Sequence, residues 1–333
     1  MDRNETILGA LLVASAVASF IATWFMVRHG RAHFLDVPNE RSSHATPTPR
    51  GGGIAFVAVF FVAAIFYGLF VKTDLRADCR WIPVAVFPLV LVGVVDDLRG
   101  LSAKYRFVAQ MLTACLIIIL LGKPLPTFIG QFGIPTTALL LFAVTIPIAA
   151  AINFSNFMDG LDGLVAGMSF VQLAFIGWYL DVSPAWLILA ALAGFLVWNW
   201  PKAKIFMGDT GSTFLGAAPV MLGILSNADP LHVVSAWTVT TPLHLDAFVT
   251  LVRRALRREN LLEGHREHLY QRLHRAGWTH ARVTLTYVTL TAACAALIGL
   301  GGVFGALGAV ALSVICYVAG ELWLSRSVSS SRA

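Results

Sequence analysis

The feature that most constrains this chain is a series of long apolar runs, each near the length of a membrane span, that recurs from end to end. A run of about 20 apolar residues can cross the hydrocarbon core of a bilayer as an α-helix. Because no water is available there, backbone N–H and C=O groups must bond within the segment, which a helix achieves. Charged residues make up only 13% of the chain, against about 25% in a typical soluble domain. The sequence therefore predicts an all-α, polytopic integral membrane protein.

The apolar runs predict eleven transmembrane helices, or ten if one of the short third and seventh runs does not span the bilayer. The expected spans are 6–27, 53–71, 81–95, 105–121, 136–152, 163–180, 184–198, 213–226, 231–246, 281–300 and 303–323. The first run has full length and is followed by basic residues, so we interpret it as a retained helix rather than a cleaved signal peptide. Glycines at 299–303 predict a turn between the last two spans. We expect one transmembrane domain over 1–325 and a disordered Ser-rich tail over 326–333.

Basic residues gather on one side of the predicted spans. If the chain crosses the membrane at every span, nineteen of its 24 Lys and Arg residues fall on the same side as loop 28–52. The positive-inside rule makes that side cytoplasmic, with the amino terminus outside and the carboxyl terminus inside. The net charge of +6 is then explained by membrane orientation and by anionic lipid or phosphate partners. It does not indicate a nucleic-acid partner.

Aspartates gather on this same side, although the spans were assigned from the apolar runs alone. They are Asp36, Asp96, Asp97, Asp159, Asp162 and Asp209. Carboxylates beside a membrane are costly unless they pair, bind a metal or line a wet cavity. Their shared side predicts a cation-binding site for phosphate groups. We expect that site to be formed by the cytoplasmic loops 28–52, 96–104, 153–162, 199–212 and 253–280.

Two of the acidic motifs suit a divalent cation. Adjacent Asp96 and Asp97 can hold a divalent ion or keep one proton between them, and the alternative is a helix end that faces water. Asp209 opens a helix in the motif Gly-Asp-Thr-Gly-Ser, where amide donors suit phosphate and the carboxylate suits Mg²⁺. The alternative there is an N-cap supplied by Asp209 or Thr210, which is compatible with metal binding.

A polar stripe interrupts the apolar pattern between the fifth and sixth spans. Asn153, Asn156, Asp159 and Asp162 recur every three residues and share one face of a helix. The functional interpretation is a ligand site, and the alternative is a polar seam between helices. The Asp-x-Asp-Gly part does not form an EF-hand, because no glutamate follows at the twelfth position.

Basic and histidine residues supply donors for anions. His44 and Arg50 lie in the amino-terminal loop, and His265, Arg266 and His268 lie in the longest polar stretch. Histidines and arginines together can bind a diphosphate, although a solvated basic loop is the alternative for this stretch. No HExxH motif is present, which disfavours a zinc protease.

Taken in order, these motifs resemble one family. The motifs are Asp-x-Pro-Asn, Thr-Pro-x-x-Gly-Gly, Val-Asp-Asp, Asn-Phe-x-Asn-x-x-Asp-Gly-x-Asp-Gly-Leu, Phe-Met-Gly-Asp-x-Gly-Ser and a His-rich loop, over about residues 30–275. They resemble the polyprenyl-phosphate N-acetylhexosamine-1-phosphate transferases of glycosyltransferase family 4. The stretch His-Arg-Glu-His-Leu-Tyr-Gln departs from the peptidoglycan and common-antigen forms, and the chain looks more like the O-antigen-initiating branch.

The resemblance implies a reaction and its partners. A Mg²⁺-dependent enzyme, with Mn²⁺ able to substitute, would transfer an amino-sugar 1-phosphate from a UDP-sugar to undecaprenyl phosphate and release UMP. The product would initiate O-antigen, lipopolysaccharide or related envelope polysaccharide at the bacterial cytoplasmic (inner) membrane. UDP-GlcNAc, UDP-FucNAc and UDP-QuiNAc stay open as donors, as does a direct or a phospho-enzyme mechanism. The oligomeric state also stays open, and a homodimer is one candidate.

The resemblance also implies roles for the motif residues. Asp209 and Asp97 would ligate the metal, and one of Asp96 and Asp97 would deprotonate or position the lipid phosphate. The remaining catalytic candidates are Asp159 and Asp162. The substrate-binding candidates are Asn153, Asn156, Asn199, Phe206, Lys104, His44, Arg50, His265, Arg266 and His268. Among these, Phe206 would stack on uracil with Asn199 nearby, and the two histidines of the polar stretch would hold the diphosphate.

Other functions are weighed against this one. Within the family, the alternatives are a phospho-MurNAc-pentapeptide transferase and a common-antigen-type transferase. The alternative from another class is a cation-coupled transporter, which requires acids near the bilayer midplane and discontinuous helices in related halves. Asp246, near His244, is the closest approach to a midspan acid.

Overall fold

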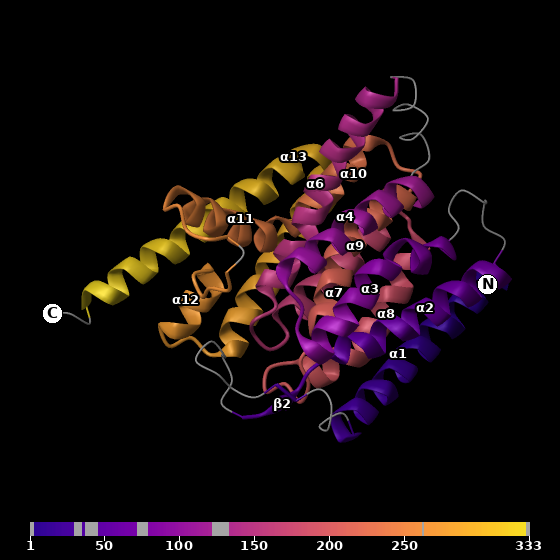
Figure 1. Ribbon diagram of the computed structural model, residues 1–333, viewed down its shortest axis with the longest axis horizontal. Coiled ribbons are helices and arrows are strands. Elements are labelled where there is room, and N and C mark those ends of the chain that lie inside the picture. Colours follow the sequence, from indigo (N-terminus) through magenta and orange to yellow (C-terminus); the bar gives the residue numbers. More distant parts are fainter. Residues whose placement is uncertain are drawn as a thin grey trace.

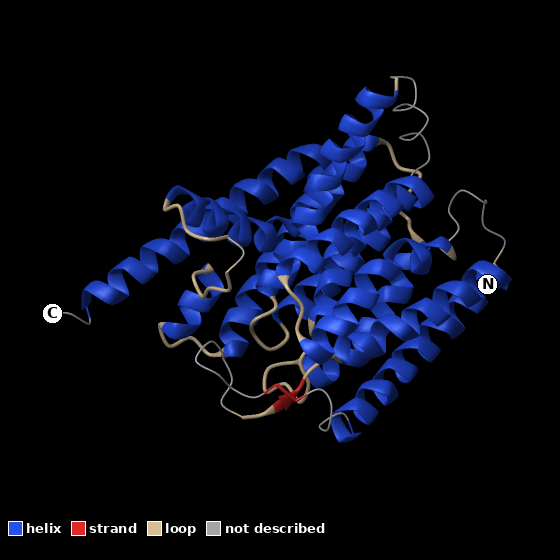
Figure 2. Cartoon of the chain, viewed as in Figure 1, coloured by secondary structure: helices blue, strands red, loops and turns tan. Residues whose placement is uncertain are grey.

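The computed structural model describes residues 3–29, 35–36, 46–71, 79–121, 133–261 and 263–330. Regular structure in these ranges is almost entirely helical (Figures 1 and 2). The first helices are α1 (Arg3–His29), α2 (Gly52–Phe70), α3 (Trp81–Arg99), α4 (Ala103–Leu116) with the π-helical turn η3 (Ile117–Leu121), and α6 (Ile134–Met158). They are followed by α7 (Leu164–Tyr179), α8 (Ser183–Asn199), α9 (Asp209–Leu225), α10 (Pro230–Trp237), η4 (Thr238–Thr240), α11 (Thr241–Leu256), α12 (Leu269–Arg275) and α13 (His280–Ser330). The strands β1 (Leu35–Asp36) and β2 (Thr48–Pro49) form a small antiparallel pair.

The surface of this bundle is that of a membrane protein. In the described ranges, six helices are long and apolar enough to cross a bilayer. Large apolar side chains face outward, such as Phe304 with 83% of its surface exposed and Val108 with 64%. Exposed apolar surface of this extent marks contact with lipid. Each predicted span coincides with a described helix or consecutive helical segments, so the prediction of an all-α polytopic protein is confirmed.

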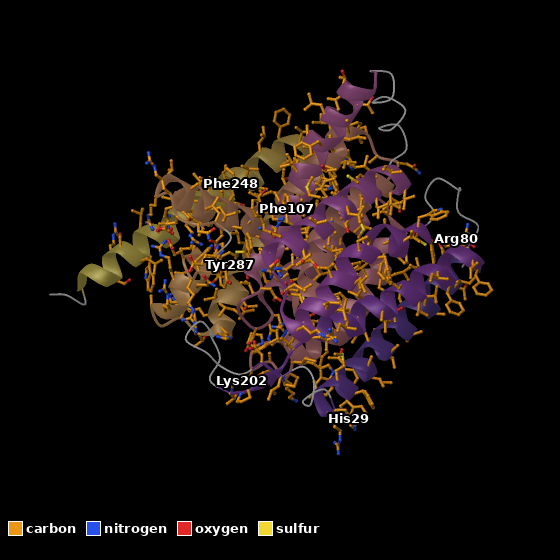
Figure 3. The ribbon with its side chains drawn as sticks, viewed as in Figure 1. His29, Arg80, Phe107, Lys202, Phe248 and Tyr287 are labelled. Carbon is orange, nitrogen blue, oxygen red and sulfur yellow. The ribbon has the colours of Figure 1, made fainter. Side chains whose placement is uncertain are left out.

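The chain alternates between two ends of the bundle. His29 at the end of α1 and Lys202 after α8 lie toward the lower end in Figure 3, and Arg80 before α3 lies toward the opposite, upper right end. The chain therefore changes ends at successive spans here, as assumed when the basic residues were assigned to the two sides of the membrane. Which end faces the cytoplasm stays a prediction from the charge distribution.

The centre of the bundle is α9. This helix packs against α2, α3, α6 and α7, and nearly all its side chains are buried. It has 17 residues, which at 1.5 Å per residue is roughly 25 Å, less than the roughly 30 Å of the hydrocarbon core. A helix covered by protein on all sides does not need full membrane length. Its first residue, Asp209, is therefore held in place by several neighbouring helices.

Two helices run further than the apolar pattern predicts. The third span ends at 95 by composition, but α3 continues through Asp96 and Asp97 until Gly100, whose N–H donates to the Asp96 carbonyl over 2.8 Å. The fifth span ends at 152 by composition, but α6 continues to Met158. Polar residues extend both helices because their side chains find partners on neighbouring helices. Both extensions bring polar groups to one end of the bundle.

The last two predicted spans form a hairpin. Gly302, with φ 53° and ψ −126°, breaks the helical geometry of α13. Cys294 Sγ then lies 3.5 Å from Ser313 Oγ, although the residues are 19 positions apart. In a straight helix such residues would be about 28 Å apart. The turn predicted at 299–303 is therefore confirmed.

The ninth predicted span, 231–246, is not one continuous helix. It consists of α10, the short 3₁₀ segment η4 and the first part of α11. Pro242 lies in the first turn of α11, where its missing N–H costs little. α11 then continues past the predicted end to Leu256, with Phe248 and Leu256 exposed and Arg254 buried. The second half of this helix is therefore amphipathic, with basic residues in its last turn.

Close backbone contacts join the start of α2 to the start of α9. The N–H groups of Gly52 and Gly53 donate to the carbonyls of Phe206 and Met207 over 2.9 and 2.8 Å. A side chain on Gly53 would overlap the backbone of Gly211 in the first turn of α9. Glycine at 53 therefore permits the approach that fixes α9 against α2.

This contact predicts a stability difference between two glycine substitutions. Gly53→Ala should lower the midpoint of thermal unfolding in detergent, since overpacking typically costs about 1–3 kcal/mol. The matched control is Gly9→Ala in α1, where nothing lies within 4 Å of the new methyl group and alanine is the better helix former. Equal midpoints for the two variants would contradict the close-approach argument.

Candidate active site

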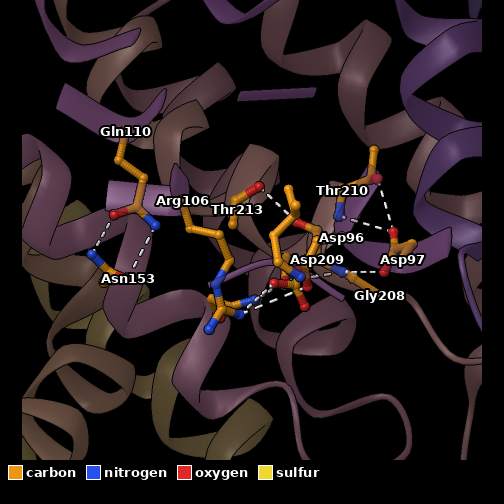
Figure 4. Close-up of polar contacts among 12 residues, drawn as sticks. Asp96, Asp97, Arg106, Gln110, Asn153, Gly208, Asp209, Thr210 and Thr213 are labelled. Carbon is orange, nitrogen blue, oxygen red and sulfur yellow. Dashed lines mark hydrogen bonds and ion pairs between the residues drawn. The ribbon is translucent and has the colours of Figure 1, made fainter. Parts of the chain in front are cut away.

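Three helix ends meet at the lower end of the bundle. The last turn of α3 carries Asp96 and Asp97, the first turn of α4 carries Arg106, and the first turn of α9 carries Asp209 and Thr210 (Figure 4). α3 packs against both α4 and α9. Segments more than 100 residues apart therefore supply one polar cluster, in which Asp209 N lies 2.9 Å from Asp97 Oδ1.

Asp97 caps α9 from a different helix. Its carboxylate accepts hydrogen bonds from Asp209 N at 2.9 Å, Thr210 N at 3.2 Å and Thr210 Oγ1 at 2.8 Å. The amides at a helix start lack partners within the helix and carry partial positive charge, so a carboxylate stabilises them. Gly208, with φ +78°, precedes the helix, and a side chain there would overlap the Asp97 carboxylate.

The cap on α9 differs from the alternative weighed for its first turn, since Asp97 of α3 supplies it and not Asp209 or Thr210. The Asp97 side chain is fully buried, and its oxygens face the α9 amides and the Thr210 hydroxyl. Its role as a metal ligand stays a prediction. Asp96 shares Arg106 with the Asp209 carboxylate.

Arg106 and Asp209 form the accessible part of the cluster, and the nearly buried Asp96 contacts the same guanidinium group. Arg106 Nη1 lies 2.9 Å from Asp209 Oδ2 and 3.8 Å from Asp96 Oδ2. The two carboxylates therefore lie beside the same guanidinium nitrogen. The Arg106 side chain is one-third exposed and that of Asp209 one-fifth. One arginine thus offsets two carboxylates at the open side of the cluster.

This pair of carboxylates fits a magnesium ion. No group of three or more acidic, His or Cys side chains in the described ranges is arranged around a metal position. Mg²⁺, however, commonly takes one or two protein carboxylates and completes its coordination with phosphate and water oxygens. Asp96 and Asp209 supply such a donor set, and an added cation would offset their mutual repulsion.

Asp159 borders the same cluster. It follows the last turn of α6, and its N–H donates to the Asn156 carbonyl over 3.2 Å. The pKa of its carboxyl is raised well above the usual range, first because surrounding protein removes it from water and then because Asp209 and the other site aspartates lie nearby. Asp159 therefore retains its proton at a pH where an exposed aspartate is ionised, and it can donate a hydrogen bond.

Asp162 binds the loop between α8 and α9 and the first residue of α13. Its Oδ2 accepts from the backbone N–H of Lys202 at 3.1 Å and of Ala203 at 3.2 Å, and lies 3.2 Å from His280 Nδ1. Burial acts to raise the pKa of Asp162, but the hydrogen bonds and charge of His280 together with the two amides lower it. Asp162 thus anchors the loop between α8 and α9 to the start of α13.

The two asparagines of the polar stripe join helices. Asn156 Nδ2 donates to Ser212 Oγ of α9 over 3.0 Å. Asn153 exchanges side-chain hydrogen bonds with Gln110 of α4, one of them 3.0 Å long. For Asn153, the contacts match the polar-seam alternative rather than a substrate contact. Within the stripe, Asn153 therefore contributes to helix packing, whereas Asp159 belongs to the acidic cluster.

The loop before α9 holds the half-buried Phe206. Asn199 is buried, and its Nδ2 donates to the Ile205 carbonyl over 2.9 Å, so its predicted place beside the nucleotide is not supported by this geometry. Phe206 is half-buried, and its backbone bonds to Pro49 and Gly52 at the start of α2. Its ring is therefore held on a fixed backbone and partly accessible.

The histidine stretch docks beside the end of α6. His268 is buried and stacks on Phe157 with ring centroids 6.3 Å apart, and the ring of half-buried His265 lies tilted against His268 with centroids 4.8 Å apart. Tyr270 OH donates to the Phe157 carbonyl over 3.0 Å. Burial lowers the pKa of His265 to about 4, with His268 and Arg254 adding to the effect. His265 is therefore neutral at pH 7.

The other predicted basic contacts lie in different surroundings. Arg50 donates from Nη2 to the Asp96 carbonyl at 2.7 Å and from Nε to the Asp97 carbonyl at 3.1 Å, which closes the end of α3. Lys104 is exposed at the start of α4. The Arg266 carbonyl accepts a hydrogen bond from Arg275. His44 lies outside the described residues.

Sequence reasoning missed Arg106 and Gln110. Both lie inside an apolar run, four residues apart, and so share one face of α4. A charged or amide side chain in a membrane span requires a partner, and this signal could have identified them. Their partners, Asp209 and Asn153, come from helices far along the chain and could not be read from spacing.

Comparisons with known proteins agree on a family. The model of glycosyl transferase family 4 matches residues 80–227. The chain is 30% identical over 269 residues to the probable undecaprenyl-phosphate N-acetylglucosaminyl 1-phosphate transferase of Bacillus subtilis (strain 168), covering 74% of this chain and 71% of the relative. It is 31% identical over 309 residues to the undecaprenyl-phosphate alpha-N-acetylglucosaminyl 1-phosphate transferase of Yersinia pestis, covering 85% and 80%.

A relative from another branch matches at nearly full length. The phospho-N-acetylmuramoyl-pentapeptide-transferase of Shouchella clausii (strain KSM-K16) is 28% identical over 312 residues, which cover 85% of this chain and 93% of the relative. The family model lies across α3, α4 and α9, the helices whose ends form the acidic cluster. On these grounds the chain belongs to glycosyl transferase family 4, among the polyprenyl-phosphate N-acetylhexosamine-1-phosphate transferases.

Proposed function

We propose that this protein is an enzyme that transfers an N-acetylhexosamine 1-phosphate group from a UDP-sugar to undecaprenyl phosphate and releases UMP. One observation carries the proposal: carboxyl groups from α3, α6 and α9 gather beside the first turn of α9, with Arg106 between two of them. Such a cluster suits two phosphate-bearing substrates that share a cation. The names of the Bacillus and Yersinia relatives support the same substrate classes.

In the proposed reaction, an oxygen of the lipid phosphate attacks the phosphorus next to the sugar. The bond from that phosphorus to the bridging oxygen breaks, and UMP leaves with the electron pair. A phosphate monoester is already largely dianionic near pH 7, so deprotonation is a minor requirement. The main difficulty is that two anions must meet, and electrostatic stabilisation is the largest contribution that a site can make.

The residues of the cluster divide this work. Magnesium held by Asp96 and Asp209, or manganese in its place, would supply positive charge to the donor diphosphate. Arg106, one-third exposed, would then direct its guanidinium to a phosphate oxygen. Asp159, whose pKa is raised by burial and by the neighbouring aspartates, would in its protonated form donate a hydrogen bond to another phosphate oxygen. Half-buried Phe206 is accessible for stacking on the uracil ring.

The lipid acceptor has an apolar surface at hand. Tyr105 and Val108, beside Arg106 in α4, are 65% and 64% exposed, and Leu98 at the end of α3 is 44% exposed. A polyprenyl tail in the bilayer would lie against these side chains while its phosphate reaches Arg106. The distribution of Lys and Arg supports a cytoplasmic location for this end of the bundle, in a bacterial inner membrane.

For the sugar we propose N-acetylglucosamine as the first donor to test, with initiation of O-antigen or a related envelope polysaccharide as the role. The names of the Bacillus and Yersinia relatives support this sugar, and the form of the histidine stretch supports the O-antigen branch. Parallel assays with UDP-FucNAc and UDP-QuiNAc test the choice. Transport has no comparable support, because the similar proteins are named transferases.

Removing the Asp209 charge should abolish most activity. Asp209→Asn should lower UMP release by a factor on the order of 10²–10³, the loss typical for one transition-state electrostatic contact. The assay uses purified protein in detergent with UDP-GlcNAc, undecaprenyl phosphate and Mg²⁺. Asp229→Asn is the matched control, since Asp229 caps α10 through the backbone N–H groups of Leu231 and His232. Full activity of Asp209→Asn would overturn the metal and phosphate assignment.

The two basic residues at the start of α4 should differ in effect. Arg106→Gln should reduce kcat at least roughly tenfold, because it removes the cation that offsets both carboxylates. Lys104→Gln should reduce it much less, since Lys104 is exposed and Arg106 is the one paired with Asp209. Steady-state rates of UMP release decide between them. Equal losses in both variants would refute the special position of Arg106.

Substitutions of the two adjacent aspartates should differ in their effects on stability and on catalysis. Asp97→Asn should lower the free energy of unfolding by about 1–2 kcal/mol, because an amide nitrogen would face the α9 donors and the cap would weaken. Asp96→Asn should lose activity with a smaller change in stability, because the amide oxygen can still accept the hydrogen bond from Leu101 N. Thermal unfolding in detergent and UMP release are measured on both variants. An Asp97→Asn protein as stable as the wild type would show that the cap contributes nothing.

A further inference from the structure

The structure points to a carboxylate that the mechanism above does not use. Asp246 lies in α11 and is completely buried. Its oxygens accept hydrogen bonds from Leu269 N at 2.8 Å, Tyr270 N at 3.1 Å and Tyr287 OH at 2.6 Å. A buried charge is costly unless it is hydrogen-bonded. The donors come from α12 and α13, so this carboxylate ties three helices together and does not offer a free ion site.

The carboxylate also faces a histidine of the candidate site. His268 Nδ1 lies 3.7 Å from Asp246 Oδ1. The side chain of His268 is 3% exposed, and its Nδ1 is buried without a hydrogen-bond partner in the described residues. A carboxylate beside one ring nitrogen orients the imidazole and favours the tautomer with its proton on that nitrogen. The other ring nitrogen, Nε2, is then left for a ligand.

Residues on one face of α11 form hydrogen bonds with both ends of the histidine stretch, residues 260–270. Asp246, Thr250 and Arg254 recur every four residues and are all buried, so they share one face of the helix. Arg254 donates from Nη2 to the Asn260 carbonyl and from Nη1 to the Glu263 carbonyl, each over 3.0 Å. Arg254 thus holds the beginning of the stretch, and Asp246 holds its end.

Tyr270 connects Asp246 to the end of α6, beside the acidic cluster. Its backbone N–H is bound by Asp246, while its hydroxyl donates to the Phe157 carbonyl at the end of α6. Phe157 stacks on His268 and lies two residues before Asp159. The position of both histidines relative to the aspartates therefore depends on the contacts that Asp246 makes.

We propose that Asp246 is a positioning residue for the donor diphosphate: it fixes the orientation of His268, and with it His265, toward the acidic cluster. The inference rests on the proposed function, because it assigns the histidines to the UDP-sugar. Asp246 itself touches no substrate. Its loss should therefore act through His268 and not in addition to it.

The test is a double-mutant cycle on kcat/KM for UDP-GlcNAc. Asp246→Asn and His268→Gln should each reduce kcat/KM roughly tenfold or more, as loss of a residue that orients a ligand-binding histidine typically does. The double variant should be no worse than His268→Gln alone, because the two act as one unit. Asp229→Asn, which removes a similar aspartate cap at α10, should keep the wild-type value.

The outcomes separate the two proposals. If the wild type releases no UMP, the proposed function fails. If the wild type is active and Asp246→Asn keeps its kcat/KM, or its loss multiplies with that of His268→Gln, the positioning role is wrong. Should Asp246→Asn not fold, Tyr287→Phe replaces it in the cycle, since this change removes the 2.6 Å hydrogen bond to the Asp246 carboxylate and leaves the carboxylate itself in place. A multiplied loss with His268→Gln would then reject the positioning role in the same way.

Discussion

The capping of α9 by Asp97 is the interaction on which the site depends. It places a carboxylate of α3 against the amides of Asp209 and Thr210, so the ends of two membrane helices meet at hydrogen-bond distance. The partial positive charge at the start of α9 offsets the buried negative charge of Asp97. Because α9 is enclosed by its neighbours, this contact fixes where Asp209 lies relative to every other acid in the cluster.

The acids of the cluster are held close at an electrostatic cost. Asp96 and Asp209 both contact Arg106. The pKa of Asp159 is raised, first by burial and then by the neighbouring carboxylates. An arrangement of this kind is stabilised by an added cation and by bound phosphates that share it. Under the proposed function, relief of this repulsion would favour binding of a metal and a diphosphate. Asp246 serves this arrangement from a distance, because it sets the place of the histidines that border it.

Much of the fold and the general location of the site could be predicted from the sequence. Apolar runs identify helices because a membrane leaves the backbone no other solution, and glycines identified the turn at Gly302. The contacts of individual polar residues could not be predicted. Asn199 and Asn153 suggest substrate contacts by motif, yet they bond to Ile205 and Gln110. Arg106 appeared to belong to a hydrophobic span, and only the approach of α9 gives it a role.

The sequence by itself determined the membrane class, the spans and the grouping of acids at one end of the bundle, because these follow from hydropathy and from the alternation of a chain that crosses a bilayer. The tertiary structure decided what each acid does. Successive residues on a helix point about 100° apart, so one of Asp96 and Asp97 must face α9 while the other faces Arg106. Which is which depends on the rotation of α3 against α9, and that rotation is set by packing between helices more than 100 positions apart in the chain.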